Sequence, residues 1–403
     1  MLKKKICIVT QSHLSHNPRV YKEAKALWSS GYDVTIINST YDRRLLDMDM
    51  DLVKDTGIKI ISIASLEKSS TSSFIFRIIR KLGVFFVSKL NIQTPLAIGY
   101  GHWKYKSAAL KEDACLYIGH QEIGLFCGLQ LIKSGRAVAF DFEDWYSEDL
   151  LAEARKYRPI HLLQKLEEQG LTMGLFSITT SKSMAVSLGK RYKAEKLPTP
   201  IYNTFDYEEN LFKQKKTFEK PIKLFWFSQT IGPGRGLESF IKLMNRINIR
   251  LEIHLLGNIN DNYRDFLTKL VNPTYQIVFH PLVHYNELQE KISEFDIGLA
   301  LELTEPLSRD LTVTNKFFQY VLSGLPVIAT NTSGQKELLR ENSFGFLIEE
   351  IESASTAKAL ENWLKDIDSL QTARSNAMKF AQKYSWQKES LKLIQLIKSN
   401  EPL

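Results

Sequence analysis

A lysine at the start of a predicted helix is the clearest candidate for chemistry in this sequence. Thr314, Asn315 and Lys316 open that helix, and Gln319 follows one turn later. Backbone N–H groups and the helix dipole attract phosphate to such a terminus, and a lysine adds a full positive charge. We therefore expect the start of this helix to bind a phosphorylated ligand.

A glycine-rich loop supplies a second candidate phosphate site. Gly232, Gly234 and Gly236 follow a predicted strand at 222–227, and Arg235 stands among them. Glycine lets the backbone approach a phosphate closely, and the arginine guanidinium provides a forked cation. An ordinary flexible turn between a strand and a helix explains the same residues, because glycine is common in such turns.

Polar residues also follow two predicted strands in the amino-terminal half. His120 comes just past one strand, and Glu143 and Asp144 follow the next. Two carboxylates at a strand end are able to orient a substrate hydroxyl and accept its proton. Capping of a helix by Asp144 or Glu148 accounts for these acids equally well.

The first strand is followed by a polar loop and a helix. Ser12 and His13 lie in the loop at residues 10–16, and Asn17 is suited to cap the helix that contains Arg19. We expect this loop to face the ligand.

The elements that must position these residues form two series of alternating strands and helices. Short apolar, β-branched strands of this kind belong to parallel sheets that are covered on both faces. The predicted strands lie at 6–9, 34–37, 58–63, 115–118, 136–140 and 175–179, and then at 222–227, 251–256, 277–279, 297–301, 326–329 and 346–348. The 403-residue chain is therefore expected to form two doubly wound α/β domains. Ligands of such domains bind in a cleft at the carboxyl ends of the strands.

Segments 227–238 and 314–330 resemble the donor-binding segments of glycosyltransferase family 4, in the subgroup whose donor-site helix starts with Asn-Lys. The resemblance covers nearly the whole chain and implies the GT-B fold, in which two Rossmann-like domains face each other across a cleft. The domains expected from it are an amino-terminal acceptor-side domain at 1–205, a linker at 206–220, a nucleotide-sugar-binding domain at 221–380 and a terminal helix at 381–403 that returns to the first domain.

The resemblance also implies a reaction. Family members transfer a sugar from a nucleotide-diphosphate sugar, with retention of anomeric configuration and without a metal ion. Arg235 and Lys316 would be the catalytic cations that neutralise the departing diphosphate, so neither a metal nor another cofactor is expected. In the family an acid at the position of Gln319 binds the ribose hydroxyls of the donor, so the resemblance implies that Gln319 contacts the donor through hydrogen bonds. The family commonly also has a glutamate at the position of Leu311, and this sequence lacks both acids.

Segments of the amino-terminal half are similar to the acceptor side of the same family. The resemblance implies catalytic roles for His120 and Glu143, although the family more often has a histidine at the position of the glutamate. The acceptor contacts that it implies are Ser12, His13, Asn17, Arg19 and Asp144.

The net charge of +8 is concentrated in one segment of the chain. Residues 68–111 include eight basic residues and no acid. Within them, 74–90 reads as a helix with an apolar stripe and cations elsewhere, as binding to an anionic membrane surface requires. The predicted membrane contacts are Arg77, Arg80, Lys81, Phe85 and Phe86. A lipid-linked or cell-surface glycan is then the expected acceptor, whereas a helix packed on its domain with a solvated basic face is the alternative.

Several other patterns indicate location and exclude ligands. The sequence has no signal-peptide core and no apolar run of about 18 residues, so we expect a cytoplasmic protein that is peripheral at the inner face of the cell membrane. The acidic run Asp47–Asp51 reads as a solvated loop, and the histidine pairs 13/16 and 280/284 lack a third ligand, so no metal is expected. Nucleic acid is not expected either, because the basic segment has apolar stripes in place of spaced aromatics.

Two other functions remain open at this point. The missing acids at Leu311 and Gln319 would suit a catalytically impaired scaffold in a glycan-assembly complex. A dinucleotide-dependent oxidoreductase would also use a glycine loop in a βαβ unit. However, the strand at 251–256 is followed by Gly257 and Asn258, and not by the acid that usually binds the ribose.

Overall fold

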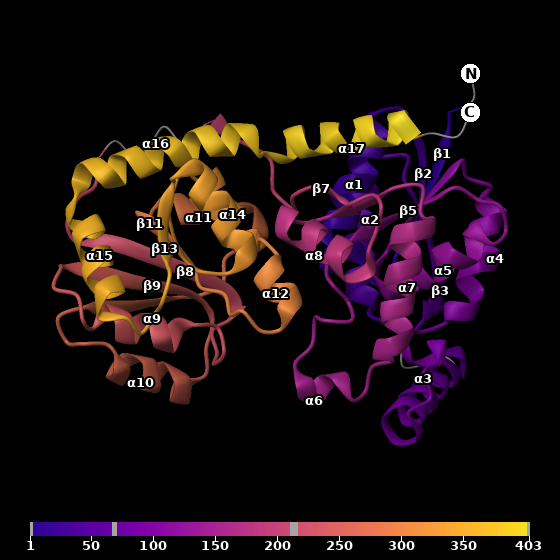
Figure 1. The fold of residues 1–403 in the computed structure, drawn as a ribbon, viewed down its shortest axis with the longest axis horizontal. Coiled ribbons are helices and arrows are strands. Elements are labelled where there is room, and N and C mark those ends of the chain that lie inside the picture. The colour runs from indigo at the N-terminus through magenta and orange to yellow at the C-terminus, as the bar shows by residue number, and fades with distance from the viewer. Residues whose placement is uncertain (1–2, 67–70, 210–216, 401–403) are drawn as a thin grey trace. The chain divides into compact units, whose positions relative to one another are not determined.

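The computed structural model describes residues 3–66, 71–209 and 217–400, which form two compact units (Figure 1). One unit holds the residues up to Ile201 together with those from Ser390 onward, and the other runs from Tyr202 to Glu389. The linker predicted at 206–220 lies partly outside the described residues, as does Lys68 of the basic segment.

The first unit is built on a seven-stranded parallel sheet in the order β3-β2-β1-β4-β5-β6-β7. All five residues of β4 and of β5 are buried, as expected for strands covered on both faces. The strands are β1 (Lys5–Val9), β2 (Asp33–Thr40), β3 (Lys59–Ser65), β4 (Leu116–His120), β5 (Val138–Phe142), β6 (Ser177–Thr179) and β7 (Thr199–Pro200). The helices are α1 (Pro18–Ser29), α2 (Arg43–Val53), α3 (Thr71–Leu90), α4 (His102–Glu112), α5 (Gln121–Ile132), α6 (Ala152–Arg155), α7 (Ile160–Met173) and α8 (Lys182–Tyr192), with short 3₁₀ turns at Leu14–His16 and Pro95–Ala97.

The second unit is built on a six-stranded parallel sheet in the order β10-β9-β8-β11-β12-β13. Helix α17 (Trp386–Asn400) begins in this unit and continues into the first, because the division falls after Glu389. The strands are β8 (Ile222–Thr230), β9 (Leu251–Asn258), β10 (Gln276–His280), β11 (Ile297–Ala300), β12 (Val327–Thr330) and β13 (Gly345–Ile348). The other helices are α9 (Leu237–Met244), α10 (Asp261–Leu270), α11 (Tyr285–Ser293), α12 (Leu307–Leu311), α13 (Asn315–Leu322), α14 (Ser333–Asn342), α15 (Ala354–Lys365) and α16 (Ile367–Lys383).

Both sheets are doubly wound, which confirms the predicted fold class. In the first, β1 pairs with both β2 and β4, so Ile8 lies opposite Ile36 on one side and Ile118 on the other. In the second, β8 pairs in the same way with β9 and β11. The order of strands reverses between β1 and β4 and between β8 and β11, and ligands of open parallel sheets bind outside the carboxyl ends at such points.

A glycine in β11 allows α13 to lie directly on the second sheet. A Cβ atom added at Gly298 would lie 2.2 Å from Cγ of Tyr320, a distance at which atoms must move apart. The Tyr320 side chain is fully buried, so its ring has no free space to move into. The absence of a side chain at Gly298 therefore fixes how closely α13, which carries Lys316, packs against β11.

Replacing Gly298 by alanine should destabilise the protein, because the new methyl group overlaps the ring of Tyr320. We expect a loss of about 1–3 kcal/mol in the free energy of unfolding, measured by chemical denaturation. Gly232→Ala is the matched control, since a Cβ there meets nothing within 4 Å. Equal stability of the two variants would contradict this account of α13 packing.

Candidate functional site

The glycine loop of the second unit runs from the end of β8 to the start of α9, at the point where the strand order reverses. Gly234 and Gly236 have φ angles of +73° and +78°, a left-handed conformation that favours glycine. A Cβ added at Gly236 would lie 3.3 Å from Cβ of Leu301, so the loop packs closely against the residue that follows β11. Arg235 lies between these glycines and is exposed.

Lys316 lies in the first turn of α13 and is held by an acid from the end of β11. Its Nζ atom is 3.0 Å from Oε1 of Glu302 and lies 5.6 Å from the centre of the Trp226 ring. Thr314 occupies the N-cap position without a side-chain capping bond, and its Oγ1 atom is buried without a hydrogen-bond partner among the described residues. Asn315 is exposed, whereas Gln319 is buried within α13.

The two predicted phosphate-binding elements therefore lie at one edge of the second sheet. Gly236 contacts Leu301, and Lys316 contacts the next residue, Glu302. The strands that lead to these contacts are neighbours, since Ile297 of β11 pairs with Leu224 of β8. Gly236, which precedes α9, and Lys316, in the first turn of α13, thus contact two consecutive residues.

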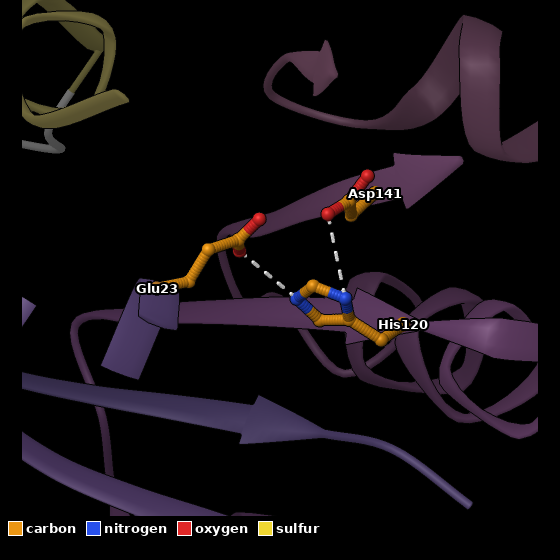
Figure 2. A group of neighbouring side chains, drawn as sticks. All are labelled: Glu23, His120 and Asp141. Atoms are coloured by element: carbon orange, nitrogen blue, oxygen red, sulfur yellow. Dashed lines mark ion pairs between the residues drawn. The ribbon is translucent and has the colours of Figure 1, made fainter. Parts of the chain in front are cut away.

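In the first unit, buried charges connect α1 with the ends of β4 and β5. His120 lies between Glu23 and Asp141 (Figure 2), with Nε2 3.1 Å from Glu23 and Nδ1 3.4 Å from Asp141. Arg19 donates to Asp141 through Nε at 2.5 Å and through a terminal nitrogen at 3.2 Å, and it also donates to the carbonyl of Ile201 at 2.8 Å. These four charged side chains are almost completely buried.

The charges around His120 favour its protonated form. Burial alone would lower the pKa of His120, but attraction to Glu23 and Asp141 raises it well above the ordinary value. Burial would likewise raise the pKa of Glu23, yet His120 and Arg19 lower it to about 2. Burial, and then the negative charge of Glu23, raise the pKa of Asp141 well above its ordinary value despite the attraction of Arg19. The ion pairs of the cluster therefore centre on Glu23, which faces both Arg19 and His120.

Glu143 forms the outer end of this cluster. Its Oε1 atom is 2.8 Å from Nδ1 of His120, and both of its carboxylate oxygens accept from Nδ2 of Asn17 at 2.9 Å. Its side chain is 13% exposed, whereas His120 is fully buried. Glu143 can therefore meet a ligand, but His120 and Arg19 cannot in this conformation. Two predictions are corrected here, namely the catalytic role of His120 and the acceptor contact of Arg19. In the structure His120 holds Glu143, and Arg19 holds Asp141.

His13 was also expected to face a ligand, and this prediction is wrong. The ring is fully buried: Nδ1 lies 2.7 Å from Asp49, and Nε2 accepts from the N–H of Tyr41 at 3.0 Å. Asp49 in turn accepts from the N–H of Ser15 at 2.8 Å. The acidic run 47–51 is consequently not a solvated loop. It forms part of α2, and its middle acid is buried against His13.

Of the other predicted acceptor residues, Ser12 and Asp144 lie nearer the surface, whereas Asn17 is buried. Ser12 is partly exposed and donates to Oε1 of Gln121 at 3.1 Å. That oxygen also accepts from the hydroxyl of Thr10 at 2.9 Å, which joins the ends of β1 and β4. Gln121 has a φ of +61°, a strained angle for a residue with a side chain and one that is often found at functional sites. Asp144 is exposed.

Glu23, Glu302 and Asp149 were not identified from the sequence. Glu23 lies four residues after Arg19, and this spacing is the sequence signal that indicates a helical ion pair. Glu302 gave no signal beyond following a predicted strand. Asp149 was also missed: burial and then Asp144 raise its pKa to about 7, and its Oδ1 atom is buried without a partner among the described residues.

Glu23, His120 and Asp141 are close enough to be considered as metal ligands. Arg19, however, already donates to Asp141 and lies 3.2 Å from Glu23. A metal ion would have to sit beside this guanidinium and displace the proton of His120. The cluster therefore fits an ion-pair network better than a metal site.

The surface of α3 combines exposed apolar side chains with two lysines. Ser73, Phe76, Gly83 and Val87 face the protein. The exposed apolar residues on the helix are Phe74, Ile75, Ile78, Leu82, Phe85 and Leu90. Two predicted membrane contacts have protein partners instead, since Arg77 donates to the carbonyl of Leu66 at 2.6 Å and Arg80 to that of Ala97. Lys81 and Lys89 are exposed, and Phe86 is half-buried. No helix among the described residues is long and apolar enough to cross a membrane.

Together, the two doubly wound sheets define a protein of the GT-B fold. Residues 222–366, which include the glycine loop, Glu302 and Lys316, match the family model of group 1 glycosyl transferases. The match lies within the second unit, so this unit is the part of the chain that is similar to group 1 glycosyl transferases. No curated protein matches the chain in sequence.

Solved structures share the fold at low sequence identity. Sucrose-phosphate synthase from Thermosynechococcus elongatus is 14% identical, with a TM-score of 0.68 over 98% of this chain and 99% of that one. HepE from Anabaena, solved with UDP and glucose, is 17% identical, with a TM-score of 0.61 over 98% of this chain and 100% of that one. A glycosyltransferase from Rickettsia africae ESF-5 is 13% identical, with a TM-score of 0.59 over 99% of both chains.

Replacing His120 should reveal its protonation through stability. Because the folded-state pKa is raised, the ion pairs of His120 stabilise the fold fully below about pH 6.5, and this contribution is lost as the pH rises through the raised pKa. We expect His120→Gln to be less stable by about 3–5 kcal/mol at pH 6, with the difference shrinking toward pH 10. Chemical denaturation across this range measures it.

The exposed His161 provides the control for this experiment. His161→Gln should track the wild type at every pH, because its side chain is in solvent in both the folded and the unfolded state. A deficit of His120→Gln that stays constant from pH 6 to pH 10 would refute the buried imidazolium.

Proposed function

We propose that the protein is a glycosyltransferase of the family 4 type that transfers a sugar, with retention and without a metal ion, from a nucleotide-diphosphate sugar to a lipid-linked or cell-surface glycan. The observation that carries this proposal is the contact of the Arg235 loop and the Lys316 helix with consecutive residues, Leu301 and Glu302, within the segment that matches group 1 glycosyl transferases. Such a protein would act in polysaccharide biosynthesis at the cell envelope.

The chemistry of the donor explains why cations are needed at this edge. As the bond to the sugar breaks, the anomeric carbon becomes cation-like and negative charge accumulates on the departing diphosphate. Arg235, Lys316 and the N–H groups that start α9 and α13 would stabilise this charge more in the transition state than in the ground state. The structures of HepE with UDP and with UDP-glucose support a donor of this kind.

The acceptor would bind at the edge of the first sheet. Glu143 has a partly exposed carboxylate whose orientation is set by Asn17 and His120. This carboxylate is suited to accept a hydrogen bond, and then the proton, from an acceptor hydroxyl. Ser12 and Asp144 would add polar contacts at the surface. His120 would act through Glu143 as a positioning residue.

Removing either donor-side cation should slow transfer. We expect Arg235→Ala and Lys316→Ala each to lower turnover at least a hundredfold, the effect of losing about 2–4 kcal/mol of transition-state stabilisation. Release of nucleoside diphosphate from a panel of nucleotide sugars provides the assay. Arg235→Ala is the cleaner variant, because Arg235 is exposed, whereas Lys316→Ala leaves Glu302 nearly buried without its cation.

Arg250→Ala is the control for these variants. Arg250 is an exposed arginine just before β9, and it therefore lies at the opposite edge of the same sheet. Its replacement should leave turnover within about twofold of the wild type. Turnover near the wild-type level for both Arg235→Ala and Lys316→Ala would refute the proposed donor site.

We further propose that α3 binds an anionic membrane that holds the acceptor. The stripe Phe74, Ile75, Ile78, Leu82 and Phe85 is between 40% and 66% exposed, which is unusual for large apolar residues on one helix face. Lys81 and Lys89 flank this stripe and would meet anionic headgroups. Arg77 and Arg80 would contribute charge near the surface while their hydrogen bonds hold the helix on its domain.

Flotation with liposomes tests membrane binding. The protein should float with vesicles that contain phosphatidylglycerol and not with pure phosphatidylcholine, and Leu82→Ser/Phe85→Ser should reduce recovery several-fold because less apolar surface enters the lipid. Leu391→Ser, which changes an exposed leucine of α17, is the matched control. Equal recovery with both vesicle types, or recovery unaffected by the double variant, would exclude this role of α3.

A further inference from the structure

Glu302 is an acid at an edge where the proposed function requires positive charge. It follows β11 by two residues, and its side chain is only 9% exposed. One carboxylate oxygen lies 3.0 Å from the ammonium of Lys316. A carboxylate at this distance cancels much of the charge that a diphosphate would use. Its presence is therefore unfavourable for phosphate binding alone and calls for another role.

The backbone of Glu302 is held firmly in place. The hydroxyl of Thr330, at the end of β12, accepts from the N–H of Glu302 at 2.8 Å and donates to its carbonyl at 2.7 Å. Gln335 donates to the carbonyl of Thr330 at 3.0 Å and is itself fully buried. With its backbone bonded on both sides and its side chain on Lys316, Glu302 has little freedom to move, as a residue that selects a ligand requires.

The chemistry of a nucleotide sugar limits what such an acid can bind. Phosphate oxygens repel a carboxylate, whereas sugar hydroxyls donate hydrogen bonds to it. The sugar is attached to the terminal phosphate, so a group adjacent to a phosphate-binding lysine lies within reach of the sugar. Glu302 is thus placed to hold Lys316 with one oxygen and sugar hydroxyls with the other.

We infer that Glu302 binds hydroxyl groups of the transferred sugar and so contributes to the choice of donor. This inference rests on the proposed donor site. It distinguishes Glu302 from Arg235 and Lys316, because those cations would bind the diphosphate whatever sugar it carries. Loss of the acid should therefore weaken the binding of nucleotide sugars without weakening that of the free nucleotide.

Titration calorimetry with matched ligands tests this inference. UDP and GDP are compared with UDP-glucose and GDP-mannose on the wild type, and the pair that binds is used for the variants. For Glu302→Gln, the dissociation constant of the nucleotide sugar should rise about tenfold or more, because a charged acceptor of hydroxyl hydrogen bonds is lost. That of the free nucleoside diphosphate should stay unchanged or fall, because a negative charge beside Lys316 is removed.

Two further variants separate this role from a structural one. Glu302→Asp keeps the charge near Lys316 but withdraws the carboxylate, so it should bind the nucleoside diphosphate like the wild type and the nucleotide sugar more weakly. Glu305→Gln changes an exposed acid three residues away and should alter neither constant. Thermal melting of each variant verifies that the protein is folded.

The possible failures are distinguishable. If Glu302→Gln weakens nucleoside diphosphate and nucleotide sugar equally, Glu302 merely supports Lys316, and the inference is wrong while the donor site stands. If the wild type binds none of the four ligands and releases no nucleotide from them, the proposed function fails and the inference fails with it.

Discussion

The parallel direction of all strands is the constraint on which both candidate sites depend. In a parallel sheet every strand ends at the same edge, so loops that are far apart in the sequence are brought together there. In the second unit this brings the loop after β8 and the residues after β11 to adjacent positions, although three strands and three helices separate Gly236 from Leu301 in the sequence. Helices α9 and α13 then start at this edge with unpaired N–H groups, where an anion is stabilised most.

Within the first unit, buried charges at the carboxyl ends of β4 and β5 hold the carboxylate of Glu143 in a fixed orientation. Removing Arg19, Glu23, His120 and Asp141 from water is costly, and the cost is offset only because each charge finds an opposite charge or a hydrogen bond. The resulting network joins α1 to the ends of β4 and β5 and leaves Glu143 at its outer end. An enzyme that needs one acceptor-side acid in a fixed orientation gains that orientation from the residues behind it.

The fold could be predicted from sequence because its signals are local. Runs such as Ile6–Val9 and Ile222–Phe227 are short, apolar and β-branched, and they alternate with helical periodicity, which indicates doubly wound parallel sheets. The glycine loop and the Lys316 helix also carry local signals, since glycine spacing and a cation at a helix start have a direct physical meaning.

The residues that were misjudged lack such signals. His13, Arg19 and His120 follow or precede strands as ligand-binding residues do, but their partners lie elsewhere in the chain, with Asp141 122 positions from Arg19. Whether a polar side chain faces a ligand or another buried charge depends on contacts that spacing does not encode.

Glu302 shows the same limit at the proposed donor site. In the sequence it is one of two acids in a short polar stretch, and its neighbour Glu305 is exposed. Its orientation depends on Thr330 from the next strand and on Lys316 from the following helix, so it emerges only when the sheet is assembled. Once oriented, it neutralises Lys316 when no anion is bound, which lowers the cost of keeping that ammonium nearly buried. A diphosphate carries more negative charge than one carboxylate and would still attract the lysine and Arg235. The acid then has an oxygen available for hydroxyl groups, so a single ion pair can both stabilise the empty site and take part in recognition of the sugar.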